Sequence, residues 1–312
     1  MHIISASRRT DIPHYYPDWF AQRRKAGYAE YRTVYGGGKA GYFKASLKQE
    51  DVYGYLFWTK YAGPFHRELA VLRKDGVPYV FQYTITGYGK DVQPGIPDRD
   101  TAIADFKAVA AGLPGPECIQ LRYDPILISD SVYTRDWHRK NFMEIVSRLA
   151  GFTRVVNVSF TEPYLKAIAK VPEGHKISWR QSTKQRETTY IKHPELHPVG
   201  AEDLELLCNM EVIARNYGMQ FRVCCNSEYS DKFPKAQCCG AELFTPYGQV
   251  LSLQVAGLKA GPSRESCQCV KTIDIGMDNT CPGGCFYCYV TTSPDLAIKN
   301  FKKHDPNSAH QR

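Results

Sequence analysis

The run Tyr79-Val80-Phe81-Gln82-Tyr83-Thr84-Ile85-Thr86 is typical of the short segments that decide the fold of this chain. Aromatic and β-branched residues dominate it, and such residues favour β-strands. Seven similar runs are found at His2–Ser7, Glu30–Tyr35, Tyr55–Thr59, Cys118–Tyr123, Val155–Phe160, Gln220–Cys225 and Thr272–Ile275. The sequence therefore predicts eight strands.

Segments with a helical pattern lie between several of these runs. Asp18–Ala26 and Thr134–Ala150 are predicted helices, and Leu204–Tyr217 is expected to be capped by Asp203. Strands that alternate with helices are typical of α/β proteins with a parallel sheet. Eight such strands over 312 residues predict a (β/α)8 TIM-type barrel, with some irregularity because of a long cysteine-rich insert.

The expected barrel divides the chain into three parts. Residues 1–225 form its main part, and residues 226–294 form a cysteine-rich, cluster-binding segment that includes the last strand. Residues 295–312 are polar and are expected to be a flexible tail. No internal repeat is found.

Polar residues follow several of the predicted strands, where a barrel of this kind carries its chemistry. Lys60 follows Tyr55–Thr59, and Arg122 and Asp124 lie at the end of Cys118–Tyr123. Buried parallel strands are usually apolar throughout, so these charges indicate a shared polar cavity. Lys60, Arg122 and Asp124 are the candidate catalytic residues. The alternative is that such charges only pair with one another and close the mouth of the barrel.

The composition limits the classes of partner. The formal charge of +8 suits an anionic partner, but the basic residues are scattered, so nucleic acid is possible and not favoured. No apolar run has the roughly 20 residues of a membrane span, and residues 1–11 lack the apolar region of a signal peptide. We therefore expect a cytoplasmic protein without a membrane partner.

Eleven cysteines without an export signal favour metal chemistry over disulfides. Ten of them follow residue 200. The segment Cys281-Pro282-Gly283-Gly284-Cys285-Phe286-Tyr287-Cys288-Tyr289 spaces three cysteines by three and then two residues. Three thiolates on one loop can hold three irons of a [4Fe-4S] cluster and leave the fourth iron open. Glycines permit the tight loop that a cluster requires.

This spacing resembles the cluster loop of the radical S-adenosylmethionine enzymes. The resemblance implies that S-adenosyl-L-methionine binds the open iron and that one electron, from a reductant such as flavodoxin or ferredoxin, breaks one of its carbon–sulfur bonds. It also implies that Tyr287 lies near the adenine. In most of that superfamily the loop follows the first strand, whereas here it follows the last. In a closed barrel the first strand would be its neighbour, so Ser7, Arg8, Arg9 and Asp11 are the candidate residues for the cofactor.

Wider stretches resemble the DUF1848 family of uncharacterised bacterial proteins. They include the segment Ile3–Pro13, Phe57–Lys60, Phe81–Thr86, Arg122–Leu127 and the region from Cys267 to Cys281. The resemblance covers nearly the whole chain, but it implies no substrate, which we expect to be a small molecule or another unknown compound.

The remaining cysteines predict a second site. An auxiliary [4Fe-4S] cluster is expected at Cys225, Cys239, Cys267 and Cys269, with Cys224 and Cys238 as substitutes. Four thiolates would equally suit a structural zinc ion. A third possibility is that Cys269 completes the first cluster, which would make the protein an electron carrier or a structural iron–sulfur protein. A member of the radical superfamily that acts on nucleic acid, similar to spore photoproduct lyase, is a further alternative.

Overall fold

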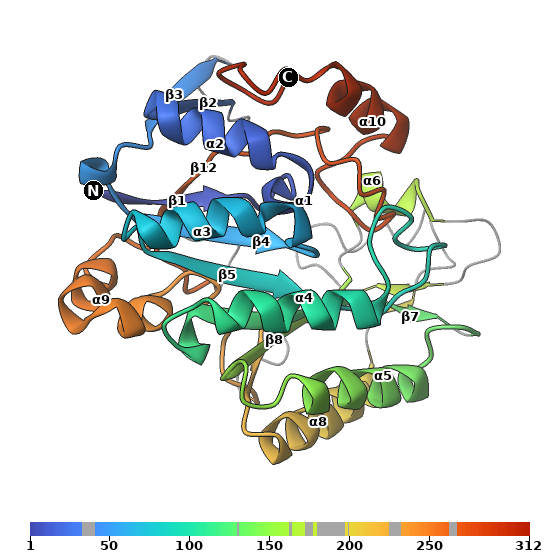
Figure 1. Ribbon diagram of the computed structural model, residues 1–312. Coiled ribbons are helices and arrows are strands. Elements are labelled where there is room, and N and C mark those ends of the chain that lie inside the picture. Colours follow the sequence, from blue (N-terminus) through green and yellow to red (C-terminus); the bar gives the residue numbers. More distant parts are fainter. Residues whose placement is uncertain are drawn as a thin grey trace.

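A computed structural model describes residues 1–32, 41–129, 131–161, 164–171, 177–179, 197–198, 200–224, 232–261 and 267–312. Its centre is a sheet of seven strands, all parallel (Figure 1). The strands are β1 (His2–Ala6), β4 (Val52–Thr59), β5 (Tyr79–Thr84), β6 (Ile119–Ile126), β8 (Val155–Phe160), β11 (Gln220–Val223) and β12 (Thr272–Asp274). Their order is β11-β8-β6-β5-β4-β1-β12.

The sheet is open, which corrects the predicted TIM-type barrel. Within the described residues, β11 and β12 form its two edges and do not pair with each other. Seven of the eight predicted runs are strands of this sheet. The eighth, Glu30–Tyr35, overlaps β2 (Tyr28–Arg32), which instead pairs antiparallel with β3 (Tyr42–Ser46) in a separate hairpin. A hairpin strand has the same local composition as a barrel strand, so the pattern alone does not separate them.

Several of the described helices cover one face of the sheet (Figure 1). They are α2 (Pro17–Ala26), α3 (His66–Lys74), α4 (Arg99–Ala111), α5 (Arg135–Arg148) and α8 (Ala201–Asn216). Successive strands lie side by side in the sheet, so right-handed crossovers place all these helices on the same side. Asp203 lies within the first turn of α8 rather than before it. Its carboxylate accepts a hydrogen bond from the Gly200 amide at 2.8 Å and one from Arg135 Nε at 2.7 Å.

Shorter elements complete the chain. The helices are α1 (Ile12–Tyr15), α6 (Leu165–Ile168), α9 (Gln249–Ala256) and α10 (Pro294–Lys303), with 3-10 turns η1 (Gln49–Asp51), η2 (Gly63–Phe65), η3 (Pro116–Cys118) and η4 (Ala241–Tyr247). A small sheet contains β7 (Ile128–Ser129), β9 (Ile177–Trp179) and β10 (His197–Pro198). None of the described helices is both long and apolar enough to cross a membrane.

Side chains of the central strands mostly alternate between the two faces of the sheet, with irregularities in β1 and β6. On β4, Tyr55 and Phe57 pack into the large core under the helices, whereas Leu56 and Trp58 point to the opposite, inner face. On the inner face of the central strands the side chains become polar. Gln82 Nε2 and Asn157 Nδ2 both donate to Gln120 Oε1 at 2.7 Å. The period of two therefore produces one apolar face and one partly polar face.

The cysteine-rich segment covers the inner face, and this explains why the sheet stays open. Leu243 and Phe244 of η4 and Val255 of α9 pack against Ile3, Leu56 and Val80, all of them buried. Glu242 accepts hydrogen bonds from Gln120 at 2.7 Å and from Arg222. A closed barrel fills its interior with its own side chains, whereas here an inserted segment supplies them.

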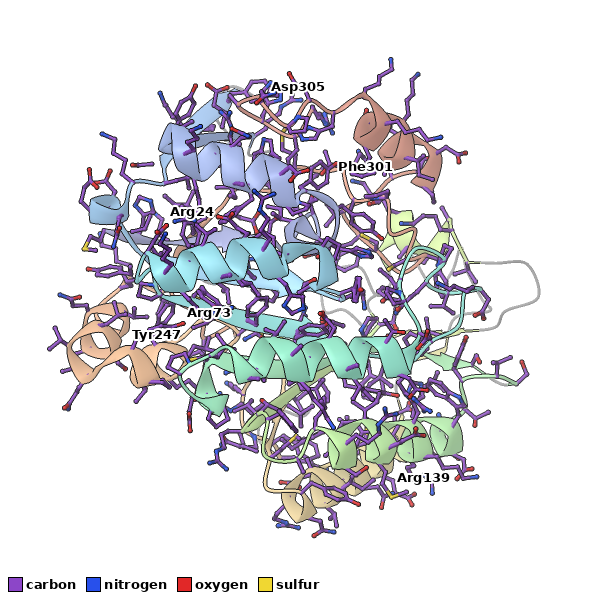
Figure 2. The ribbon with its side chains drawn as sticks, viewed as in Figure 1. Arg24, Arg73, Arg139, Tyr247, Phe301 and Asp305 are labelled. Carbon is purple, nitrogen blue, oxygen red and sulfur yellow. The ribbon has the colours of Figure 1, made fainter. Side chains whose placement is uncertain are left out.

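The C-terminal residues differ from the predicted flexible tail. Residues 294–303 form α10, and the aromatic ring of Phe301 lies edge-on to those of Tyr15 and Tyr16 (Figure 2). Beyond the helix, the Ser308 carbonyl accepts a hydrogen bond from Trp19 Nε1 at 2.9 Å. These contacts fix a segment whose polar composition suggested no burial.

Candidate metal and cofactor site

The loop with the three spaced cysteines follows β12 and extends across the carboxyl edge of the sheet. The Phe286 amide donates to the Val92 carbonyl at 3.2 Å, and the Gly95 amide donates to the Gly283 carbonyl at 3.1 Å. Val92 and Gly95 follow β5, and β1 and β4 lie between β12 and β5. The loop therefore lies above the ends of four neighbouring strands.

Tight backbone geometry holds this loop in place. Gly284 has a φ of +70°, and a Cβ atom there would lie 2.7 Å from the Pro94 ring. Only glycine combines that left-handed conformation with so close an approach. Gln93 Nε2 also donates to the Tyr287 hydroxyl at 2.5 Å, which orients the ring that sequence analysis placed near the adenine.

The three loop thiols lie close enough to influence one another. Burial raises the pKa of Cys281, and Asp11, Cys285 and Cys288 raise it further. Burial also raises the pKa of Cys285, whereas Lys60 lowers it. Iron binds the thiolate form of cysteine, which burial disfavours. A bound iron cluster must therefore supply the free energy for deprotonating these buried thiols.

Lys60 is the positively charged side chain that lowers the pKa of Cys285. It follows β4, and its buried Nζ has no hydrogen-bond partner among the described residues. The ammonium lies 5.6 Å from the centre of the Tyr287 ring. Burial lowers the pKa of Lys60, while Cys285 and Asp124 oppose that shift. An unpaired buried ammonium is costly, so an anionic group beside Cys285 would stabilise it.

Asp11, a predicted cofactor residue, already has several partners within the chain. Its carboxylate caps α1 by accepting from the His14 amide at 3.1 Å, and accepts from Thr59 Oγ1 at 2.7 Å and the Lys60 amide at 2.8 Å. Burial raises its pKa to about 7, although these hydrogen bonds oppose the shift. Asp11 therefore orders the end of β4 below the cysteine loop.

Two more predicted cofactor residues are bound to an acid that the sequence analysis missed. Asp274, the last residue of β12, accepts from Ser7 Oγ at 2.7 Å, from the Arg8 amide at 2.9 Å and from Arg9 Nε at 3.4 Å. Burial opposes ionisation of Asp274, but Arg9 and Arg8 lower its pKa overall. Ser7 and Arg9 thus join β1 to β12.

The Arg8 side chain is less engaged, since its Nε is 3.8 Å from Asp274 Oδ2, beyond hydrogen-bond distance. Its guanidinium lies 5.8 Å from the centre of the Trp58 ring. Arg122 lies 5.0 Å from the same ring. The Trp58 indole donates to Ser5 Oγ at 3.0 Å, which fixes its orientation. Two arginines from β6 and from the end of β1 therefore meet over one indole.

Arg122 and Asp124 form an ion pair on the inner face, and Asp124 also accepts from Ser159. Asp124 and Ser159 point to the same face of the sheet as Arg122, because side chains alternate between the two faces along each strand. All three lie on the face where the polar cavity was predicted. The buried Arg122 Nε has no partner among the described residues. Burial opposes its charge, but Asp124 and nearby thiols raise the pKa of Arg122 overall.

The second set of cysteines meets on the inner face, in a different combination from the predicted one. Cys238 lies close enough to Cys224 and Cys269 for these thiols to raise its pKa, and Cys267 raises the pKa of Cys269. Cys239 is buried and interacts electrostatically with Cys269 and Cys267. Burial is the chief reason that its pKa is raised.

The structure thus joins the two cysteines that were considered substitutes, Cys224 and Cys238, to Cys267 and Cys269. The predicted ligand Cys225 lies outside the described residues. Cys224 shares the inner face with Arg222, two residues earlier, and this period of two is the signal that could have selected it. Cys269 lies with this set, among the residues of the inner-face core.

In the described part of the chain, no three Cys, His, Asp or Glu side chains surround a common point as ligands of a single metal ion do. A cluster places each thiolate on a different iron and does not require that convergence.

The fold and site define a protein with a seven-stranded parallel sheet whose polar inner face and carboxyl edge carry two sets of cysteines. A family model described as a domain of unknown function (DUF1848) matches residues 3–290, and the chain belongs to that family. No curated protein and no solved structure matches the chain.

Proposed function

We propose that this protein is an enzyme of the radical S-adenosylmethionine type. Cys281, Cys285 and Cys288 would hold a [4Fe-4S] cluster whose fourth iron binds S-adenosylmethionine. When bound, the cluster supplies one electron that breaks a carbon–sulfur bond of this cofactor. The electron would come from a flavodoxin- or ferredoxin-like reductant.

One observation carries this proposal: the buried Lys60 ammonium, without a hydrogen-bond partner in the described chain, lies 5.6 Å from the Tyr287 ring centre in the cysteine loop and interacts electrostatically with Cys285. A cluster bound by three thiolates has a net negative charge, and so does the carboxylate of S-adenosylmethionine. Either would supply the counter-charge that the described residues do not provide for Lys60. Thiols that stay protonated would leave the ammonium buried and unpaired.

The chain's own residues would prepare the site in several ways. Asp11 and Thr59 hold the end of β4, so that the Lys60 backbone is fixed below the loop. Lys170 Nζ donates to the Cys288 carbonyl at 2.6 Å and thereby holds the end of the loop. Gln93 orients Tyr287.

The second cysteine set is proposed to hold an auxiliary [4Fe-4S] cluster through Cys224, Cys238, Cys267 and Cys269. Cys224, Cys269 and burial raise the pKa of Cys238, and Arg8 and Arg122, which interact electrostatically with it, supply the positive charge that favours the thiolate iron requires. A single zinc ion at these four thiols is the alternative that the sequence left open, but no three of the described side chains surround a common point as tetrahedral coordination requires.

Anaerobic reconstitution with iron and sulfide tests the proposal. The reduced protein is expected to give an electron paramagnetic resonance signal that S-adenosylmethionine alters, and chromatography should detect a cleavage product such as 5′-deoxyadenosine. Cys285→Ser should abolish both results. Cys208→Ser is the matched control, because Cys208 is an exposed cysteine on α8.

A reduced cluster whose signal is insensitive to S-adenosylmethionine, without any cleavage product, would refute the enzymatic proposal and leave an electron-transfer or structural iron–sulfur protein. Binding of zinc alone, without iron at either set, would refute the iron–sulfur assignment as well.

A further inference from the structure

Three cationic side chains, each partly buried, lie on the inner face near the carboxyl ends of β1, β4 and β6. Arg8 and Arg122 both lie over the Trp58 indole, at 5.8 and 5.0 Å from the ring centre. Lys60 is two residues beyond Trp58 on the same strand line, and it interacts electrostatically with Arg122. Like charges this close repel one another unless negative charge lies among them.

The nearby carboxylates are already bound to other donors. Asp124 accepts from Arg122 Nη2 and from Ser159, and Asp11 accepts from Thr59 and two backbone amides. Asp274 accepts from Ser5, Ser7, Arg9 and the Arg8 amide. Even so, Arg122 Nε and Lys60 Nζ remain buried without partners in the described chain. Buried donors are almost always satisfied, so these two indicate a missing acceptor. The Lys60 ammonium has three donors, so the negative charge proposed at the cysteine loop leaves donors for a second anion.

The three cations lie between the two sets of cysteines. Lys60 faces the loop, where Cys285 is its strongest opposing charge. Arg8 and Arg122 face the second set, because both interact with Cys238. Tyr289, at the end of the loop, also interacts with both arginines. A molecule held here would have the cysteine loop on one side and the second set on the other.

We propose that Arg8, Lys60 and Arg122 bind an anionic group of the substrate, a carboxylate or a phosphate. Arginine presents its donors in a planar fork that matches the oxygens of either group, and the indole of Trp58 holds both guanidiniums in position. The assignment of this anion to a substrate rests on the proposed function, whereas the anion site itself is defined by Arg8, Lys60 and Arg122.

Equilibrium dialysis of the reconstituted protein tests the site with two probes, inorganic phosphate and succinate. We expect saturable binding of at least one probe. Loss of one charged donor should weaken that binding about tenfold or more in Arg122→Gln and in Lys60→Met. Arg139→Gln is the control, because Arg139 is an exposed arginine on α5 that points away from the sheet (Figure 2).

A second measurement does not depend on these substitutions. Trp58 lies under two of the cations, so binding of the probe should change the tryptophan fluorescence of the wild-type protein, and Trp58→Phe should remove that change. Preference for phosphate would identify a phosphorylated substrate, and preference for succinate a carboxylate substrate. Absence of binding by both probes, or equal binding by wild type, Arg122→Gln and Lys60→Met, would overturn the proposal.

The outcome is separable from that of the proposed function. Phosphate or succinate binding without cleavage of S-adenosylmethionine by the wild-type protein would refute the radical mechanism and support the anion site. Cleavage without binding of either probe would do the reverse.

Discussion

Replacement of one cysteine in the vicinal pair Cys238-Cys239 tests the proposed second metal site most directly. The pKa of Cys238 is raised chiefly by its neighbours Cys224 and Cys269, whereas the raised pKa of Cys239 arises chiefly from burial. Cys238→Ser should therefore remove a ligand, and Cys239→Ser should not. Two four-iron clusters give about eight irons per chain, and loss of one leaves about four.

Iron, sulfide and zinc are measured in anaerobically reconstituted wild type and in the two variants. Wild type and Cys239→Ser are expected to hold about eight irons, and Cys238→Ser about four. Both side chains are buried, at 4 and 2 % exposure, so the two substitutions disturb the packing to a similar extent. Equal metal loss in both variants, or a loss confined to Cys239→Ser, would refute the assignment of ligands. Loss of zinc instead of iron from Cys238→Ser would keep the ligands but change the metal.

Three further predictions concern the fold. Phe81→Ala should lower the free energy of unfolding by about 3–5 kcal/mol in urea titrations, because the ring is fully buried under the helices; an effect below about 1 kcal/mol would contradict that packing. Gly54→Ala should strongly destabilise the protein, because a Cβ atom there would lie 2.5 Å from a backbone oxygen. Gly257→Ala should be near neutral, because a Cβ atom there would lie no closer than 3.5 Å to its neighbours. Similar melting temperatures for the two variants would argue against this. Burial lowers the pKa of His138 to about 4, below its usual 6.5. The stability that the neutral His138 contributes is therefore fully present above pH 6.5, and the free energy of unfolding falls by roughly 3 kcal/mol as the pH falls to 4. His138→Gln should flatten the pH dependence of the free energy of unfolding, and an unchanged slope would refute this.

The sequence predicts the strands well because most of them are buried on both faces. Val155–Phe160 has the predicted bounds, and β5 ends two residues earlier than predicted. Such runs owe their conformation to local preference together with burial, and both are visible in composition. The flexible tail was predicted from polarity alone, whereas the contacts of Phe301 and Ser308 with the first helices depend on the tertiary fold.

Closure of the sheet could not be predicted in the same way. Whether β11 reaches β12 depends on what fills the inner face, and Leu243 and Phe244 fill it from a segment with no strand pattern. The residues of the candidate site could likewise be predicted only in part. The loop cysteines were evident from their spacing, but Asp274 was not, because its role depends on register between β12 and β1. A one-residue change of register would place its carboxylate on the other face.

The two cores of the molecule differ in how far they depend on the cysteines. The large core under the helices contains aromatic and aliphatic side chains and no cysteine, so its packing is complete without metal. The inner-face core includes Cys118, Cys238, Cys239 and Cys269 among its buried members. Thiols are apolar enough to pack there when neutral, and burial favours that neutral form. The sheet therefore presents Arg8, Trp58 and Arg122 on a scaffold whose packing under the helices does not depend on metal. The proposed metal binding would act on the covering segment and would complete the second cysteine set beside the proposed anion site.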